Sequence, residues 1–129
     1  MTDRFKFRVW DKLDEEYYDE NCFQMQIESS GDLFIIGVGN DGEDCFWETD
    51  NTVIEQCTGL KDKNGKLIYE NDLIKIDSDV AVIKWSDYYA RFMLESQEDN
   101  FDFETTYAEE CEVIGNIHEN ADLLESENG

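Results

Sequence analysis

The stretch that decides the fold is TGLKDKNGKLIYENDLIKI, residues 58–76. Asn64-Gly65 lies between two apolar segments, and these residue types best tolerate the positive φ angles of a tight hairpin turn. Apolar residues resume at Leu67 and are interrupted at 70–72 by Glu-Asn-Asp, whose polar side chains favour turns by bonding to nearby backbone. The stretch therefore predicts a hairpin followed by a second turn and another strand.

The N-terminal segment predicts a further strand. Phe5, Phe7 and Val9 alternate with cationic residues, which is the period-two pattern of a strand with one buried and one solvated face. The solvated face carries Arg4, Lys6 and Arg8. We expect these cations to neutralise carboxylates of a neighbouring strand or subunit, with a dedicated anion site as the alternative.

Short apolar runs separated by turn residues recur along the rest of the chain, and predict a mainly β fold, all-β or α+β, with antiparallel strands. The expected strands lie at 23–27, 33–36, 80–85, 91–94 and 111–117, with strand starts at 46–47 and 53–54. A minor helix is expected at 104–110. Their spacing favours a bent sheet or SH3-like barrel in the C-terminal half. We expect one β-rich domain at 1–119, made of an N-terminal hairpin region (1–53) and an SH3-like region (54–119), then an acidic tail at 120–129 that begins with one helical turn.

Three blocks in this order resemble the YopX-like family, small proteins of phages and prophages of Gram-positive bacteria. They are FKFRVWDK at 5–12, the 58–76 stretch, and VIGNIHEN at 113–120. The sequence departs from the family at Asn71, where Gly is common, and at Ala121, where Pro is common. Asn still adopts left-handed turn geometry, so the turn is expected to persist. The resemblance implies no enzymatic activity, cofactor or catalytic residue.

The charge of the chain restricts its partners. It contains 33 acidic and 10 basic residues, a formal net charge of −23. Such a charge disfavours direct binding to nucleic-acid phosphates or anionic membranes and favours a basic or DNA-binding protein as partner. Residues 14–55 hold thirteen acidic residues and no Lys or Arg. A rigid surface of this kind could imitate the phosphates of DNA, although acidity also serves solubility alone.

Cysteine spacing and hydropathy indicate a cytoplasmic protein, and the family resemblance implies that the cytoplasm is that of a bacterial host. Cys22, Cys45, Cys57 and Cys111 lie 23, 12 and 54 residues apart, which matches no redox or zinc motif, and predicts free thiols. No apolar run approaches the roughly 20 residues that span a bilayer, and no signal peptide is evident.

Catalytic motifs are weak throughout. His118 is the only histidine, and we interpret it as an ordinary polar residue at the end of a strand. Asp72, Asp77 and Asp79 are the candidates for carboxylate or metal-assisted chemistry, with solvated turn residues as the preferred interpretation. The glycine-rich residues 37–42 lack the spacing of a dinucleotide motif, and no calcium loop aligns. We therefore predict no catalytic, cofactor or metal site.

An interaction surface is the better functional hypothesis. Its candidate residues are Trp85, Tyr88 and Tyr89 at the rim of the expected barrel, and Lys61, Lys63 and Lys66 at the hairpin tip. The lysines could pair with acidic regions of a second subunit, which predicts a homo-oligomer. Two function classes stay open: a non-enzymatic acidic module that binds host or phage protein, including as a DNA mimic, and a small carboxylate- and metal-dependent hydrolase or nuclease.

Overall fold

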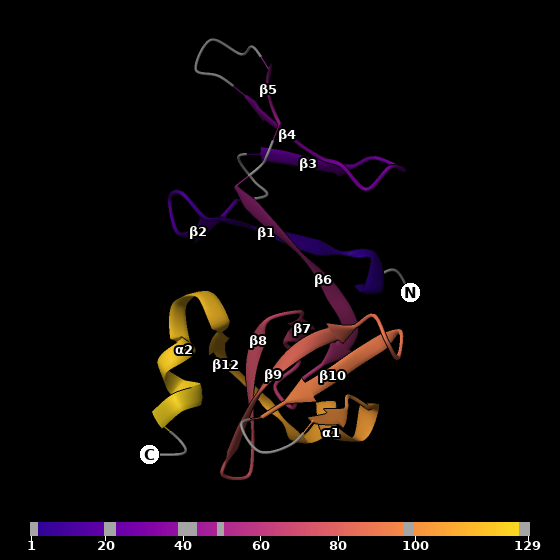
Figure 1. The fold of residues 1–129 in the computed structure, drawn as a ribbon, viewed down its shortest axis with the longest axis vertical. Coiled ribbons are helices and arrows are strands. Elements are labelled where there is room, and N and C mark those ends of the chain that lie inside the picture. The colour runs from indigo at the N-terminus through magenta and orange to yellow at the C-terminus, as the bar shows by residue number, and fades with distance from the viewer. Residues whose placement is uncertain (1–2, 20–22, 39–43, 49–50, 97–99, 127–129) are drawn as a thin grey trace. The chain divides into compact units, whose positions relative to one another are not determined.

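The computed structural model describes residues 3–19, 23–38, 44–48, 51–96 and 100–126 (Figure 1). The chain divides into two compact units, one made of Met1–Phe7 with Glu55–Gly129 and the other of Arg8–Ile54. Both are built from antiparallel strands, so the predicted mainly β fold is confirmed. In Glu55–Gly129, two helices complete the structure. No described helix is long and apolar enough to cross a membrane.

The unit Arg8–Ile54 consists of strand pairs. After a short 3-10 helix (η1), the β1 strand pairs with β2, placing Trp10 opposite Tyr17, and β3, β4 and β5 form a three-stranded sheet in that order. The N-terminal hairpin expected from the sequence is therefore present as β3–β4. The bounds are Asp3–Phe5 for η1, Phe7–Asp11 for β1, Glu16–Tyr17 for β2, Phe23–Ile27 for β3, Leu33–Val38 for β4 and Asp44–Glu48 for β5.

One part of the N-terminal prediction is wrong. Phe5 does not alternate inward with Phe7 and Val9: it ends η1 and is 59% exposed. The strand starts only at Phe7, and its buried residues are the consecutive Val9, Trp10 and Asp11. The backbone turn closed by Lys6 N–H on the Asp3 carbonyl at 3.0 Å takes Phe5 out of the extended geometry that the alternation requires.

The larger unit is organised around a five-stranded antiparallel sheet in the order β11-β10-β9-β8-β12, which curls like part of a barrel (Figure 1). Next to it, β6 and β7 form the hairpin predicted by Asn64-Gly65. The strands are Thr52–Lys61 (β6), Leu67–Tyr69 (β7), Asp72–Ile76 (β8), Asp79–Ser86 (β9), Arg91–Glu95 (β10), Asn100–Asp102 (β11) and Glu112–Asn116 (β12), and the helices are Thr105–Glu110 (α1) and Ile117–Ser126 (α2).

The core of this unit lies between the curled sheet and α1. Six buried residues from five elements and one connection contact one another: Ile68, Ile74, Ile83, Leu94, Ala108 and Cys111. The strands β8, β9 and β10 contribute one residue each. Leu73 and Val82, next to Ile74 and Ile83 in sequence, are buried too, so β8 and β9 are buried on both faces. α2 packs against β8, β9 and β12, and is kinked at Asn120, whose φ and ψ are −132° and 27°.

Positive-φ residues mark the β6–β7 and β7–β8 turns of this unit. At the β6–β7 turn only Gly65 is left-handed, with φ +83°, so Asn64-Gly65 is not a two-residue turn. Instead the Gly65 N–H closes on the Asp62 carbonyl at 3.0 Å and the hairpin loop is longer. At the β7–β8 turn Asn71 has φ +69°, as expected where the family commonly has Gly.

Candidate functional site

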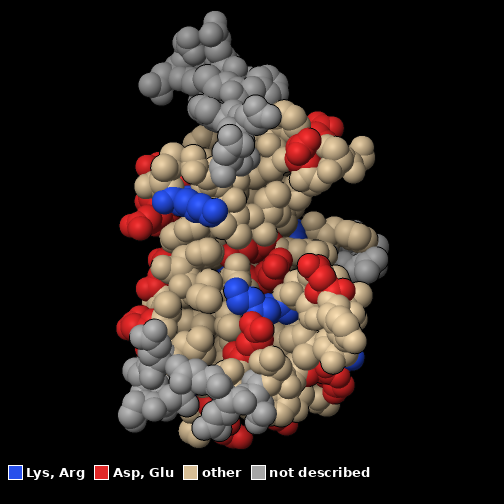
Figure 2. All heavy atoms as spheres, in the orientation of Figure 1, with Lys and Arg blue, Asp and Glu red and all other residues tan. Residues whose placement is uncertain are grey.

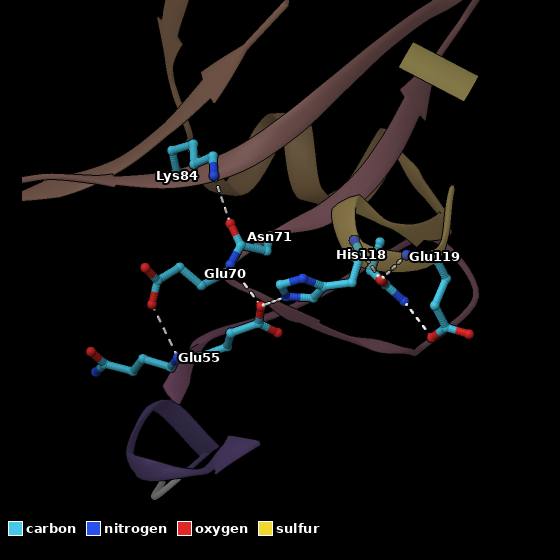
Figure 3. Close-up of polar contacts among 8 residues, drawn as sticks. Glu55, Glu70, Asn71, Lys84, His118 and Glu119 are labelled. Atoms are coloured by element: carbon cyan, nitrogen blue, oxygen red, sulfur yellow. Dashed lines mark hydrogen bonds and ion pairs between the residues drawn. The ribbon is translucent and has the colours of Figure 1, made fainter. Parts of the chain in front are cut away.

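A buried polar network lies where β6, the β7–β8 turn, β9 and α2 meet (Figure 3). Its centre is Glu55 on β6, whose side chain is fully buried. One oxygen of this carboxylate, Oε2, accepts a hydrogen bond from Asn71 Nδ2 at 2.6 Å and lies 2.6 Å from His118 Nε2. Lys84 Nζ donates to Asn71 Oδ1 at 2.8 Å. The network thus joins four elements through one buried carboxylate.

Backbone hydrogen bonds hold Asn71 in the position that this network needs. Its N–H donates to the Ile83 carbonyl at 2.8 Å, and its carbonyl accepts from the Ile117 N–H at 2.9 Å. The left-handed φ of Asn71 turns the chain sharply between β7 and β8. The side-chain amide is then directed with its nitrogen to Glu55 and its oxygen to Lys84, as Figure 3 shows.

His118 is positioned by the start of α2. The side-chain Oδ1 of Asn116 accepts hydrogen bonds from the backbone N–H groups of His118 and Glu119, both at 3.0 Å. Asn116 also donates from Nδ2 to Glu119 Oε1 at 3.0 Å, so this pair closes the N-terminal end of the helix reciprocally. The imidazole then reaches inward to Glu55, with 17% of the His118 side chain exposed. His118 therefore belongs to a helix and a buried network, and its interpretation as an ordinary strand-end residue is wrong.

A carboxylate held on an imidazole is an arrangement found in acid–base catalysis, where the acid orients the ring. In this molecule the same contact also connects residues 63 positions apart in the sequence. The two atoms lie 2.6 Å apart, which is a short hydrogen-bond distance. Among the described residues, no group of three or more His, Cys, Asp or Glu side chains is arranged to hold a metal ion. The network is best interpreted as a structural connection between β6 and α2.

The β6–β7 turn contains a second buried carboxylate, Asp62. Its Oδ1 accepts from the N–H groups of Asn64 and Lys66, and its Oδ2 accepts from the Val113 N–H, each at 2.9 Å. Burial raises the pKa of Asp62, but these three backbone N–H groups lower it by more, so the pKa lies below its ordinary value of 3.8. The carboxylate connects the turn to β12.

The three aromatic residues predicted as an interaction surface lie on one hairpin, β9–β10. Trp85 is 43% exposed, Tyr88 88% and Tyr89 55%. The Tyr88 and Tyr89 rings meet edge to face with centroids 4.9 Å apart, and Trp85 contacts Phe92 across the strand pair at 5.1 Å. The structure therefore places all three at the same end of the sheet, with large parts of their rings open to solvent.

The three predicted lysines form a separate set at the β6–β7 turn. Lys61, Lys63 and Lys66 are exposed, and Lys63 Nζ lies 3.9 Å from Glu112 Oε2 on β12. They lie on a different hairpin from the aromatic residues. The structure thus divides the predicted surface into an aromatic part and a cationic part.

The carboxylates considered for hydrolytic chemistry are not gathered at one place. Asp72 begins β8, whereas Asp77 and Asp79 follow its other end, so a five-residue strand of roughly 16 Å separates them. Asp77, in the β8–β9 turn, and Asp79, the first residue of β9, are both exposed, as expected. Asp72 is not solvated: it is 2% exposed and its Oδ2 accepts from the Tyr69 N–H at 2.8 Å. It serves the β7–β8 turn.

Two of the four cysteines lie among residues with described side chains, and both are free thiols, as predicted. Cys57 and Cys111 are fully buried. Desolvation raises the pKa of both thiols, that of Cys111 to about 11, so both stay protonated at neutral pH. Cys22, the side chain of Cys45 and the glycine-rich residues 39–42 lie outside what the structure describes.

Glu55 is the residue that sequence reasoning missed. A signal for it exists in the TVIEQC segment: Glu55 has the same strand parity as Val53 and Cys57, so period two places it on the inward face. An acidic residue at such a position requires buried partners. The identity of those partners depends on how distant segments pack.

The chain resembles proteins of prophage origin along nearly its whole length. The sequence model described as "YopX protein" matches residues 6–125. The chain is 30% identical over 131 residues to the SPbeta prophage-derived uncharacterized protein YopX of Bacillus subtilis (strain 168), covering 92% of this chain and 95% of that protein.

Solved structures agree with this similarity. The crystal structure of protein EF1440 from Enterococcus faecalis matches with a TM-score of 0.66 and 30% identity, covering 92% of this chain and 96% of that one. The X-ray structure of protein yopX from Bacillus subtilis has the same fold, with a TM-score of 0.65 and 24% identity over 94% of this chain and 98% of that one. From the sequence match and the shared fold, the chain belongs to the YopX protein family.

Proposed function

We propose that this protein is a non-enzymatic acidic module that binds a basic protein of the bacterial host or of the phage. The observation that carries the proposal is the excess of exposed carboxylates over available cations. The unit Arg8–Ile54 contains thirteen acidic residues and only two basic ones, Arg8 and Lys12. The acidic residues with described side chains, apart from Asp11, are all exposed: Asp14, Glu15, Glu16, Asp19, Glu28 and Asp32.

Several of the ten cations already have neighbours within their own unit. In Arg8–Ile54, the Arg8 guanidinium lies over the Tyr17 ring at 4.6 Å. In the larger unit, Lys6 pairs with Asp3 at 3.2 Å, and Arg91 with Asp102 at 2.9 Å. These exposed pairs neutralise little of the total charge of −23. Figure 2 shows the result on one face, where acidic side chains are spread over much of the described surface and basic ones occupy a few places.

A surface of this kind favours a cationic partner, because complementary charge accelerates encounter and disfavours acidic competitors. Hairpins hold part of the carboxylates in fixed positions: at the β3–β4 turn, Ser30 Oγ donates to Asp32 Oδ2 at 3.0 Å and Gln26 Nε2 donates to Glu28 Oε1 at 3.1 Å. Ordered carboxylates are what a DNA mimic requires. We therefore include DNA-binding proteins among the proposed partners.

The hydrolase or nuclease alternative receives no comparable support. Its candidate carboxylates lie at opposite ends of β8, and Asp72 is engaged with backbone inside the fold. The proposed function thus uses carboxylates on the surface for binding.

The test is affinity capture from lysate of a Gram-positive host at low and at moderate salt, with the retained proteins identified. A neutralised variant carries Asp14→Asn, Glu16→Gln and Glu28→Gln in the unit Arg8–Ile54. The matched control removes the same charge from exposed positions of the larger unit, with Asp79→Asn, Glu109→Gln and Glu110→Gln. We expect a basic protein to be retained by the wild type, released by moderate salt, and retained less by the neutralised variant than by the control.

Two results would contradict the proposal: retention of no basic protein, or retention that none of the charge changes affects. If the captured protein binds DNA, competition by duplex DNA tests mimicry, since a mimic and DNA exclude each other. The predicted homo-oligomer is tested separately by sedimentation at high protein concentration, where a single monomeric species would contradict it.

A further inference from the structure

We propose that the tip of the β9–β10 hairpin is an arginine-binding site, which takes arginine side chains of a basic protein segment by stacking them on Trp85, Tyr88 and Tyr89. This inference rests on the proposed function, because it specifies how the basic partner is recognised. To the acidic surface of Arg8–Ile54 it adds a second contact, a small aromatic surface of the larger unit, and it predicts a preference for arginine over lysine.

The first observation is that the tip of the β9–β10 hairpin holds exposed aromatic side chains. Tyr88 is 88% and Tyr89 55% exposed, although aromatic rings gain most from burial. The backbone of Tyr89 is nevertheless held: its N–H donates to Ser86 Oγ at 3.1 Å, and Ser86 pairs with Arg91 in the strand register. Rigid, exposed aromatic residues are typical of surfaces that bind a partner.

The hairpin itself contains an example of the contact that we propose. The Arg91 guanidinium lies 5.1 Å from the centre of the Tyr89 ring, while its Nη1 lies 2.9 Å from Asp102 Oδ2. An aromatic face and a carboxylate thus hold one guanidinium together. This is the combination that suits a planar, delocalised cation.

Trp85 and Asp87 offer a second set of the same groups. The indole Nε1 donates to Asp87 Oδ1 at 3.0 Å, which places a carboxylate beside a ring that is 43% exposed. Trp85 is also held by Phe92 on the other strand. The two ring centroids lie 5.1 Å apart and the rings meet at an angle of 74°. The indole is the strongest cation–π partner among the aromatic side chains. An incoming arginine can therefore stack and form an ion pair at once.

Charge decides between the partners that aromatic residues attract. Nucleic-acid bases also stack on such rings, but a chain with a net charge of −23 repels the phosphates that accompany them. A basic protein segment brings the opposite sign. The occupant that fits both the rings and the charge is therefore an arginine-bearing polypeptide.

The experiment uses the full chain and two labelled peptides of equal length and charge, one alternating arginine with glycine and one alternating lysine with glycine. Fluorescence anisotropy at low salt gives both dissociation constants. The variant Tyr88→Ala/Tyr89→Ala removes two rings, Tyr88→Phe/Tyr89→Phe keeps them, and Phe5→Ala removes an exposed aromatic ring from η1 as a matched control. Circular dichroism verifies the fold of each variant.

We expect the arginine peptide to bind more tightly than the lysine peptide. Its dissociation constant should rise about tenfold in the double alanine variant and stay within about twofold of wild type in the phenylalanine variant and the control. Equal affinity for both peptides, no binding of either, or no effect of the alanine substitutions would overturn the hairpin site. So would a single-stranded oligonucleotide that binds more tightly than the arginine peptide and depends on the same rings.

Capture of a basic protein that the hairpin substitutions leave unchanged would separate the two proposals, because the acidic module would stand while the arginine site would not.

Discussion

Two of the carboxylates that the larger unit buries, Glu55 and Asp62, are bound in contrasting ways. Glu55 lies on β6 and is bound by side chains from elsewhere, Asn71 at a separation of 16 residues and His118 at 63. Asp62 lies at the end of the same hairpin strand and is bound only by backbone N–H groups, two of them within four residues. A buried carboxylate can thus be satisfied locally by a turn or globally by the packing of distant elements.

This difference determines what each residue contributes. Two of the three N–H groups, those of Asn64 and Lys66, stay near Asp62 whenever the turn forms, so its contribution belongs mostly to the hairpin. The partners of Glu55 are assembled only when β6, β8 and α2 have packed, so its contribution depends on the complete unit. Glu55 therefore couples elements, whereas Asp62 stabilises one turn and its contact with β12.

The largest expected effect follows from removing the centre of the buried network. Glu55→Ala leaves the Asn71 amide and the His118 ring facing a cavity, and should reduce the free energy of unfolding by about 3–5 kcal/mol. Glu55→Gln keeps the volume and should cost less. Glu109→Ala, an exposed position on α1, is the control and should stay within about 0.5 kcal/mol. Urea denaturation measures all three, and a loss below about 1 kcal/mol in Glu55→Ala would show that the network does not couple the elements.

A smaller loss is expected at the local carboxylate. Asp62→Ala removes the acceptor for three backbone N–H groups and should cost about 2–3 kcal/mol, because bonds to a charged acceptor are stronger than neutral ones. Asp79→Ala provides an exposed control at the start of β9. If Asp62 acts locally, hydrogen exchange in Asp62→Ala should rise mainly at the β6–β7 turn and β12. An equal rise in α2 would contradict the local role.

Asn71 distinguishes turn geometry from side-chain bonding, since it supplies both. Asn71→Gly and Asn71→Ala both remove the amide between Glu55 and Lys84, but only Ala keeps a Cβ at φ +69°. We expect both variants to be less stable than wild type, with Asn71→Ala lower than Asn71→Gly by about 1 kcal/mol. Equal urea midpoints would mean that the turn relaxes away from its left-handed conformation.

The same contrast between local and long-range contacts explains which parts of the fold and of the site could be predicted from the sequence. The strands at 33–36, 80–85 and 91–94 were predicted from short apolar runs, and the turns at Gly65 and Asn71 from their residue types, because these signals act over a few residues. The site residues were only partly predictable. Trp85, Tyr88 and Tyr89 share one hairpin and could be grouped from their spacing. The contact of Glu55 with His118 could not, since it depends on α2 returning to β6 after 63 residues. Phe5 was assigned wrongly because one 3-10 turn ends the alternation.

The smallest expected effect is the response of Asp62 to acid, which changes one proton while keeping the shape of the group. Its pKa is lower in the folded state than the ordinary 3.8, so the ionised carboxylate stabilises the fold above that value, and the stabilisation is lost as pH falls through the lower folded pKa. Many other carboxylates titrate in the same range, and comparison with Asp62→Asn cancels them. The stability difference between wild type and Asp62→Asn should therefore be constant from about pH 7 to about pH 5 and decrease below about pH 4. A difference that stays constant in acid would mean that the three N–H groups bind the protonated carboxyl group as well as the carboxylate, and the local half of the comparison would then depend on turn geometry rather than on charge.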